Sequence, residues 1–177
     1  ELLPSQIQAA NPLLIMALTP LFTYVVYPRL NKLFELTAIR KMAIGLFLTV
    51  IAYAIASAIQ MRIDSGAIPN ISWQLPAYLI LTSAEVMVSI TCLEFSYRQA
   101  PKSMKSFIMA FYLLSIALGN LVTSAVNFFI QNDDGTSKLE GASYFWFFTL
   151  LMLLVALLFV SASAHFKENN YFSDDLG

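Results

Sequence analysis

The sequence predicts an all-α membrane protein with five transmembrane helices. Two observations lead to this fold class. Of the 177 residues, 58% are hydrophobic and only 12% are charged, whereas a soluble domain has about 45–50% apolar and about 25% charged residues. Five segments also stay apolar over the roughly 20 residues that a helix needs to cross the hydrocarbon core of a bilayer. A net charge of −1 and a single cysteine give no indication of nucleic-acid binding or of a disulfide framework.

The five predicted helices follow one another along the whole chain. They cover residues 5–27, 42–61, 73–95, 103–130 and 144–165. Each segment is too long and too uniformly apolar for an ordinary buried strand. Ser5, which follows Pro4, is expected to be the N-cap of the first helix.

The basic residues lie mostly on one side of these helices, and Lys and Arg are in excess on the cytoplasmic side of membrane proteins. Only Arg62 and Lys138 fall on the opposite side. The connections after the first, third and fifth helices hold the other eight of the ten: Arg29, Lys32, Arg40, Lys41, Arg98, Lys102, Lys105 and Lys167. We therefore expect a protein of the plasma (inner) membrane with residue 1 outside and the C-terminus in the cytoplasm. Because no signal sequence precedes residue 1, at least one further helix is expected upstream.

Glu85 lies near the middle of the third predicted helix, where an ionised acid costs about 2.5–3.5 kcal/mol on insertion scales. In a regular α-helix it would share one face with other polar or small side chains: Tyr78, Thr82, Ser89, Cys92 and Ser96. The structural interpretation is a protonated carboxyl that bonds to another helix. The functional interpretation is a proton or substrate site, at which a proton and an ammonium group compete for one carboxylate.

Two other helices carry polar candidates. Asn11 precedes Pro12 in the first helix, where the alternatives are a simple kink and a side chain that lines a cavity. Tyr112 in the fourth helix is either a packing residue or part of a binding wall. Gly119, seven residues later, is expected at a close helix contact.

Near the cytoplasmic end of the third helix, Glu94 is expected to form interfacial ion pairs with Lys102 and Lys105, and a role in a cytoplasmic gate is the alternative. The sequence shows no nucleophile–base pair, phosphate-binding loop or metal cluster. Only Glu85 lies deep in a span, so the acid pair of an intramembrane hydrolase is lacking, and we expect no enzyme and no cofactor other than protons.

Three stretches resemble the proton-coupled oligopeptide transporters of the major facilitator superfamily: QIQAANPLLIMALTP, SAEVMVSITCLEFSYRQAPKSMKS and FYLLSIALGNL. The resemblance covers nearly the whole chain, as helices eight to twelve of that family. It implies that the five helices form most of the C-terminal six-helix bundle of a major facilitator fold. It also implies symport of protons with di- and tripeptides, for which an N-terminal half outside this chain would supply the other wall of a central site.

The same resemblance suggests roles for individual residues. Glu85 would meet the α-amino group of the peptide and take part in protonation, and Asn11 and Ser89 would line the peptide site. Tyr112 falls where the family commonly has a Trp, which changes the aromatic wall of the pocket. Two rival functions remain: a major facilitator that carries another small solute, and a non-transporting subunit of a membrane assembly.

Overall fold

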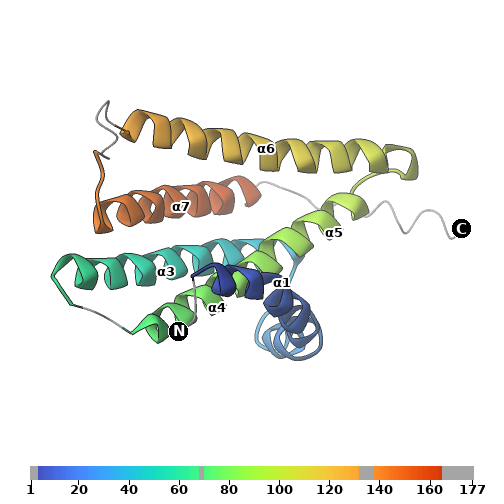
Figure 1. Ribbon diagram of the computed structural model, residues 1–177. Coiled ribbons are helices and arrows are strands. Elements are labelled where there is room, and N and C mark those ends of the chain that lie inside the picture. Colours follow the sequence, from blue (N-terminus) through green and yellow to red (C-terminus); the bar gives the residue numbers. More distant parts are fainter. Residues whose placement is uncertain (1–3, 68–69, 132–137, 165–177) are drawn as a thin grey trace, which may run out of the picture.

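A computed structural model describes residues 4–67, 70–131 and 138–164 of the chain (Figure 1). All the regular elements in these ranges are helical. In chain order they are α1 (Pro4–Leu21), η1 (Phe22–Val26), α2 (Tyr27–Asn31), α3 (Ala38–Asp64), η2 (Ile71–Trp73), α4 (Gln74–Glu85), η3 (Val86–Ile90), α5 (Thr91–Arg98), η4 (Lys102–Met104), α6 (Lys105–Ile130) and α7 (Ala142–Ser163). The elements η2 and η4 are short 3₁₀ turns, and η1 and η3 are π-helical turns inside longer helices.

Within the described residues, five helices are long and apolar enough to cross a membrane, which confirms the predicted fold class. They cover Asn11–Asn31, Ala38–Asp64, Gln74–Arg98, Lys105–Ile130 and Ala142–Ser163. Each overlaps one predicted segment and differs from it by a few residues at its ends. The end of the fifth predicted helix, at His165, lies outside the described residues.

Two helix starts show how local chemistry sets these limits. Helix α1 begins at Pro4, so Ser5 lies within the helix and the prediction of an N-cap at Ser5 was wrong. Proline suits a first helical turn because its φ angle is already helical and its missing N–H needs no partner there. Thr37 caps α3, because its side-chain oxygen accepts a hydrogen bond of 3.3 Å from the Arg40 amide.

Helix α3 is the centre of the packing and lies against both α4 and α7 (Figure 1). Its contact with the third membrane segment is close at Gly45, where a Cβ atom would lie 2.6 Å from Val88 Cγ2 and 3.1 Å from the Ala84 carbonyl oxygen. Its contact with α7 includes a buried pair of hydroxyl groups, Ser57 Oγ and Thr149 Oγ1, which lie 3.3 Å apart. Close backbone approach at small residues is how helices associate in lipid, where apolar burial gives little driving force.

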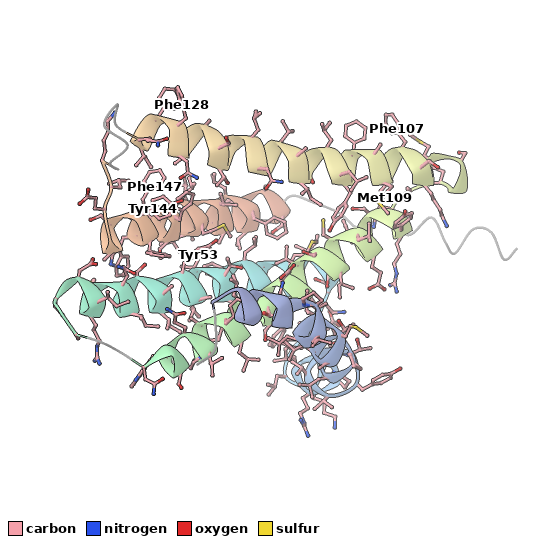
Figure 2. All side chains as sticks on the ribbon, viewed as in Figure 1. Tyr53, Phe107, Met109, Phe128, Tyr144 and Phe147 are labelled. Atoms are coloured by element: carbon pink, nitrogen blue, oxygen red, sulfur yellow. The ribbon has the colours of Figure 1, made fainter. Side chains whose placement is uncertain are left out.

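Helix α6 stands apart from this packing. It has no buried residue, and it contacts α5 and η4 at one end and α7 through a 2.9 Å hydrogen bond from the Tyr144 hydroxyl to Asn127 Oδ1. Phe107 and Phe128 point away from the other helices (Figure 2) and are 56% and 76% exposed. Gly119 has no atom of the described chain within 4 Å of where its Cβ would lie. The close helix contact predicted at Gly119 is therefore absent from the described part of the chain.

Candidate functional site

The first and third membrane segments bring Asn11 and Glu85 together. The Asn11 side-chain amide donates a hydrogen bond of 3.3 Å to Glu85 Oε2. The Thr82 hydroxyl lies 3.1 Å from Asn11 Oδ1 and 2.9 Å from the carbonyl oxygen of Tyr78. Thr82 is buried, Asn11 is half-buried and Glu85 is exposed. The carboxylate is therefore held at one oxygen by an amide, while the side chain stays accessible from the open side of the bundle.

Both segments change their helical winding after their site residue, the third directly after Glu85 and the first about three turns after Asn11. Pro20 cannot donate a backbone hydrogen bond, and the π-helical turn η1 begins two residues later, where the Tyr27 amide bonds to the Phe22 carbonyl. The second π-helical turn, η3, begins directly after Glu85. π-Helical turns inside α-helices often occur at functional sites. Asn11 and Glu85 thus lie in the α-helical parts that precede two irregular turns.

Side chains of both π-helical turns belong to one buried cluster. Phe22 of η1 belongs to one buried cluster with Leu18 of α1 and with Val86 and Met87 of η3. Met87 is only 1% exposed. This apolar contact fixes the first segment against the third, and it thereby fixes the separation of Asn11 and Glu85.

The π-helical turn also changes the polar face that the sequence predicts. Ser89 lies within η3 and is half-buried, and its hydroxyl has no hydrogen-bond partner among the described residues. The expected stripe from Tyr78 to Ser96 assumed a regular α-helix. A π-helical turn has more residues per turn than an α-helix. Residues after η3, such as Cys92 and Ser96, are therefore rotated about the helix axis relative to Thr82 and Glu85 when compared with a regular α-helix. The regular α-helix that the predicted stripe assumed is therefore interrupted directly after Glu85.

The structure does not join Tyr112 to this pair. Tyr112 is half-buried on α6, and its carbonyl oxygen accepts a hydrogen bond of 2.7 Å from the Ser115 hydroxyl. In the described part of the chain, no hydrogen bond connects the Tyr112 side chain to Asn11, Glu85 or Ser89. Tyr112 stays a prediction as a site residue.

Glu94 has a different ionic partner from the ones predicted. Its carboxylate pairs with Arg98, one helical turn later, at 2.5 Å, and the side chains of Glu94 and Arg98 are 51% and 63% exposed. Lys105 begins α6, and Lys102 lies in η4, where its side chain is outside the described residues. The described ion pair of Glu94 is thus an intrahelical one with Arg98, and the pairs with Lys102 and Lys105 stay predictions.

No group of three or more metal-binding side chains (His, Cys, Asp or Glu) occurs within residues 4–67, 70–131 and 138–164. The sequence analysis also did not select Lys41 and Thr91, which line a polar cavity beyond the Asn11–Glu85 pair. Lys41 was used there only as a positive charge beside the membrane, and a single Thr in an apolar helix gives no signal of its own.

Comparisons with known proteins identify the family of the chain. The sequence model PTR2, described as the POT family, matches residues 1–147. The chain is 47% identical to solute carrier family 15 member 2 of Rattus norvegicus over 90 residues, which are 51% of this chain and 11% of the rat protein. It is 31% identical to peptide transporter PTR2 of Saccharomyces cerevisiae over 134 residues, 68% of this chain and 22% of the yeast protein. The chain therefore spans only a small part of the length of these relatives.

Solved structures of transporters have the same fold. The crystal structure of an auto-inhibited POT family peptide transporter superposes with a TM-score of 0.87 at 36% identity and covers 95% of this chain, which matches 34% of that protein. The in meso crystal structure of the POT family transporter PepTSo gives a TM-score of 0.83, also at 36% identity, over 92% of this chain and 34% of PepTSo. The family match, the related sequences and the shared arrangement of five membrane helices lead to one conclusion: the chain is an integral membrane protein that belongs to the POT family of transporters.

Proposed function

We propose that these five helices form part of a transporter that carries di- and tripeptides together with protons across the membrane. The observation that carries this proposal is the hydrogen bond from Asn11 to Glu85, which holds a single accessible carboxylate between two irregular membrane helices. The names of the relatives, which include peptide transporters of Drosophila melanogaster and yeast, support peptides as the substrate class.

The arrangement around Glu85 suits a group that alternates between two cationic partners. The Asn11 amide satisfies one carboxylate oxygen and leaves acceptor positions for a proton or for the α-ammonium group of a peptide. A proton on the carboxyl removes the charge that attracts the ammonium group. Binding of the two is therefore mutually exclusive at full strength, and such competition couples proton release to peptide binding.

The other predicted site residues take supporting roles in this proposal. Ser89, on the π-helical turn that follows Glu85, offers a hydroxyl to the peptide backbone. Tyr112 on α6 supplies an aromatic wall. The N-terminal half of the transporter, with its own ionisable groups, supplies the opposite wall, and one half rocks against the other around the site. In this proposal the ends of α2, α5 and α7 lie on the cytoplasmic side, where Lys and Arg are in excess.

Peptide uptake by the complete transporter in proteoliposomes tests this function. With an imposed proton gradient, labelled Ala-Ala should accumulate, and unlabelled dipeptides should compete better than free amino acids or other small solutes. Glu85→Gln keeps the shape and the hydrogen bond from Asn11 but removes the titratable group, so gradient-driven uptake should fall at least tenfold. Glu35→Gln, which neutralises an exposed carboxylate in the loop before α3, should leave uptake unchanged.

Two results would contradict the proposal. Normal proton-driven uptake by Glu85→Gln would remove Glu85 from the coupling step. A complete protein that neither accumulates Ala-Ala nor is stabilised by it would favour another solute or a non-transporting role in an assembly.

A further inference from the structure

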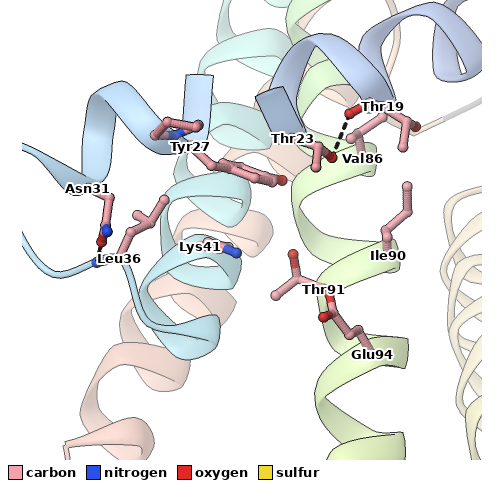
Figure 3. Close-up of a pocket in the computed structure, with 11 residues that line it drawn as sticks. Thr19, Thr23, Tyr27, Asn31, Leu36, Lys41, Val86, Ile90, Thr91 and Glu94 are labelled. Atoms are coloured by element: carbon pink, nitrogen blue, oxygen red, sulfur yellow. Dashed lines mark hydrogen bonds between the residues drawn. The ribbon is translucent and has the colours of Figure 1, made fainter. Parts of the chain in front are cut away.

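A second polar cavity lies beyond the Asn11–Glu85 pair, towards the end of the bundle that carries most of the Lys and Arg residues. Its volume is about 460 Å³, and it lies between η1 and α2, the first turn of α3, and the end of the third segment (Figure 3). Neither Asn11 nor Glu85 lines it. It is therefore a separate space from the candidate peptide site, and its volume falls within the range of about 300–1,000 Å³ that is usual for small-molecule pockets.

The cavity carries one positive and one negative side chain on different helices. Lys41 enters it from α3, and Glu94 lies on the α5 wall (Figure 3). The Lys41 ammonium lies 4.4 Å from the centre of the Tyr27 ring, which holds it over the aromatic face by a cation–π interaction. Arg98 pairs with Glu94 through Oε1 only, so Oε2 of Glu94 has no partner among the described residues. The formal charges of Lys41 and Glu94 sum to zero.

Hydroxyl groups line the cavity between these charges. The Thr23 hydroxyl donates to the Thr19 carbonyl oxygen at 2.8 Å, and the Thr19 hydroxyl donates to the Ile15 carbonyl oxygen at 2.7 Å. Because each hydroxyl proton is used within its own helix, both hydroxyl oxygens remain available as acceptors. Thr91 adds a further hydroxyl on the α5 wall, one helical turn before Glu94. The cavity thus holds hydroxyl acceptors and the Glu94 carboxylate, and Lys41 is its cationic donor.

A smaller cavity continues the polar surface to the end of α5. Its volume is about 240 Å³, and it shares Lys41, Thr91 and Glu94 with the first cavity. Arg98 and Gln99, the last residue of α5 and the one after it, line its far side. A ligand in the first cavity therefore lies next to a polar route that leads out at this end of the bundle.

We propose that the cavity between Lys41 and Glu94 is a second binding site for a short zwitterion, namely a dipeptide on its way out of the transporter. The ligand's carboxylate would bind Lys41, and its ammonium group would bind Glu94 and the neighbouring hydroxyl oxygens. A purely anionic ligand would meet the Glu94 carboxylate, and a purely cationic one would meet Lys41, so neither fits as well as a ligand that carries both charges. This inference rests on the proposed peptide transport and adds a site that the Asn11–Glu85 pair does not require.

Binding stoichiometry on the purified complete transporter tests the second site. Equilibrium dialysis with labelled Ala-Ala should give two molecules per wild-type transporter. Lys41→Met and Glu94→Gln each remove one charged partner, should weaken the second site about tenfold or more, and should leave one molecule bound at the same concentration. Ile90→Trp, which fills the cavity without changing a charge, should have the same effect. The matched controls Lys32→Met and Glu35→Gln alter exposed charges outside the cavity lining and should bind two.

The outcomes separate this inference from the proposed function. One bound Ala-Ala in the wild type, weakened by Glu85→Gln and unaffected by Lys41→Met, would overturn the second site and leave peptide transport standing. No binding at all would overturn both. Two molecules in Lys41→Met, Glu94→Gln and Ile90→Trp alike would also overturn the assignment. Size-exclusion profiles like that of the wild type identify the variants that fold. If a charge variant does not fold, Ile90→Trp alone tests whether the second site exists.

Discussion

The Asn11 amide and the Glu85 carboxylate are joined by a hydrogen bond across 74 residues of sequence. Asn11 also lies 3.1 Å from the Thr82 hydroxyl through its other side-chain atom, Oδ1. The amide is thus fixed by Thr82, one helical turn before Glu85, and it presents its N–H group to the acid. This relationship couples the orientation of Glu85 to the packing of two separate membrane segments, and it makes Asn11 a positioning residue for the carboxylate.

Removal of that amide should impair peptide uptake by the complete transporter. We expect Asn11→Ala to lower the ratio kcat/KM for Ala-Ala about tenfold to a hundredfold, because a hydrogen bond to a charged group is worth about 1.5–3 kcal/mol and each 1.4 kcal/mol is tenfold. Thr82→Val keeps the bond from Asn11 to Glu85 and removes only the support behind it, so its effect should be smaller. Uptake kinetics measure both. A Thr82→Val effect larger than that of Asn11→Ala would show that Thr82 acts by another route.

Gly45 permits the close approach of α3 to the third segment, and a side chain there should destabilise the protein. The Cβ of alanine would lie 2.6 Å from Val88 Cγ2 and 3.1 Å from the Ala84 carbonyl oxygen. Since the backbone and a β-branched side chain yield little, we expect Gly45→Ala to cost about 1–3 kcal/mol, the usual range for overpacking. The thermal midpoint of the purified protein measures this loss.

Gly119→Ala is the matched control, because the described chain leaves open space at Gly119. There, alanine should be neutral or should stabilise α6 by up to about 1 kcal/mol through its higher helix propensity. If Gly119→Ala lowers the thermal midpoint as much as Gly45→Ala does, then close packing at Gly119 involves a segment beyond the described residues.

The helices could be predicted from the sequence because each one satisfies a requirement of length and apolarity that few other structures meet. The π-helical turns could not. Pro20 gave a local reason for a kink before η1, but nothing in the residues around Val86 marks a change of winding. Such a turn depends on which backbone carbonyls bond across tertiary contacts, here beside Gly45 and the buried Met87. For the same reason the sequence could not show that the regular helix assumed for the polar stripe ends at Glu85.

In the candidate site, too, single residues could be predicted from the sequence and their contacts could not. Glu85 and Asn11 were identifiable as polar residues in apolar helices, since an unpartnered polar group in a membrane is costly. Only the resemblance to a known family assigned both to one peptide site, because no local pattern relates residues so far apart. Their hydrogen bond comes from the structure. Lys41 and Thr91 were missed because each has an ordinary explanation on its own. Only the structure shows that they face one cavity.

The buried hydroxyls of Ser57 and Thr149 should contribute little to stability as a pair. Each hydroxyl also lies 2.8 Å from a carbonyl oxygen of its own helix, that of Tyr53 for Ser57 and that of Phe145 for Thr149. Two hydroxyl protons serve three contacts, so the contact between the two helices competes with the bonds inside them. We expect a coupling energy of about 0.6 kcal/mol, as is typical of such pairs in membrane proteins.

A double-mutant cycle measures this coupling. Ser57→Ala, Thr149→Val and the combined variant are compared by reversible unfolding in detergent, and each single variant should lose about 1 kcal/mol or less. A coupling energy above 2 kcal/mol would mean that the contact between α3 and α7 takes precedence over the bonds within each helix.

Asp64, the last residue of α3, should stabilise the start of α7. Its Oδ2 atom accepts a hydrogen bond of 2.8 Å from the Ala142 amide, and its Oδ1 atom accepts one of 2.9 Å from the Gln60 side chain. The residue before α7 is Gly141, which has no side chain to cap the helix and adopts a φ of 56°. Asp64, which belongs to α3, therefore takes the role of an N-cap residue for α7. Its negative charge also interacts favourably with the positive end of the α7 dipole.

We expect Asp64→Ala to lower stability by about 0.5–2 kcal/mol, the usual cost of losing an N-cap, and to speed hydrogen exchange in the first turn of α7. Asp64→Asn keeps an acceptor oxygen, so its loss of stability should be less than half of the loss in Asp64→Ala. Gly141→Ala should be more damaging than Asp64→Ala, because its Cβ would overlap the Asp64 carboxylate and its φ angle disfavours any side chain. Thermal unfolding gives the stabilities, and exchange measured by mass spectrometry gives the local effect. If exchange in α7 were unchanged in Asp64→Ala while the midpoint fell, the carboxylate would stabilise α3 through Gln60 rather than cap α7.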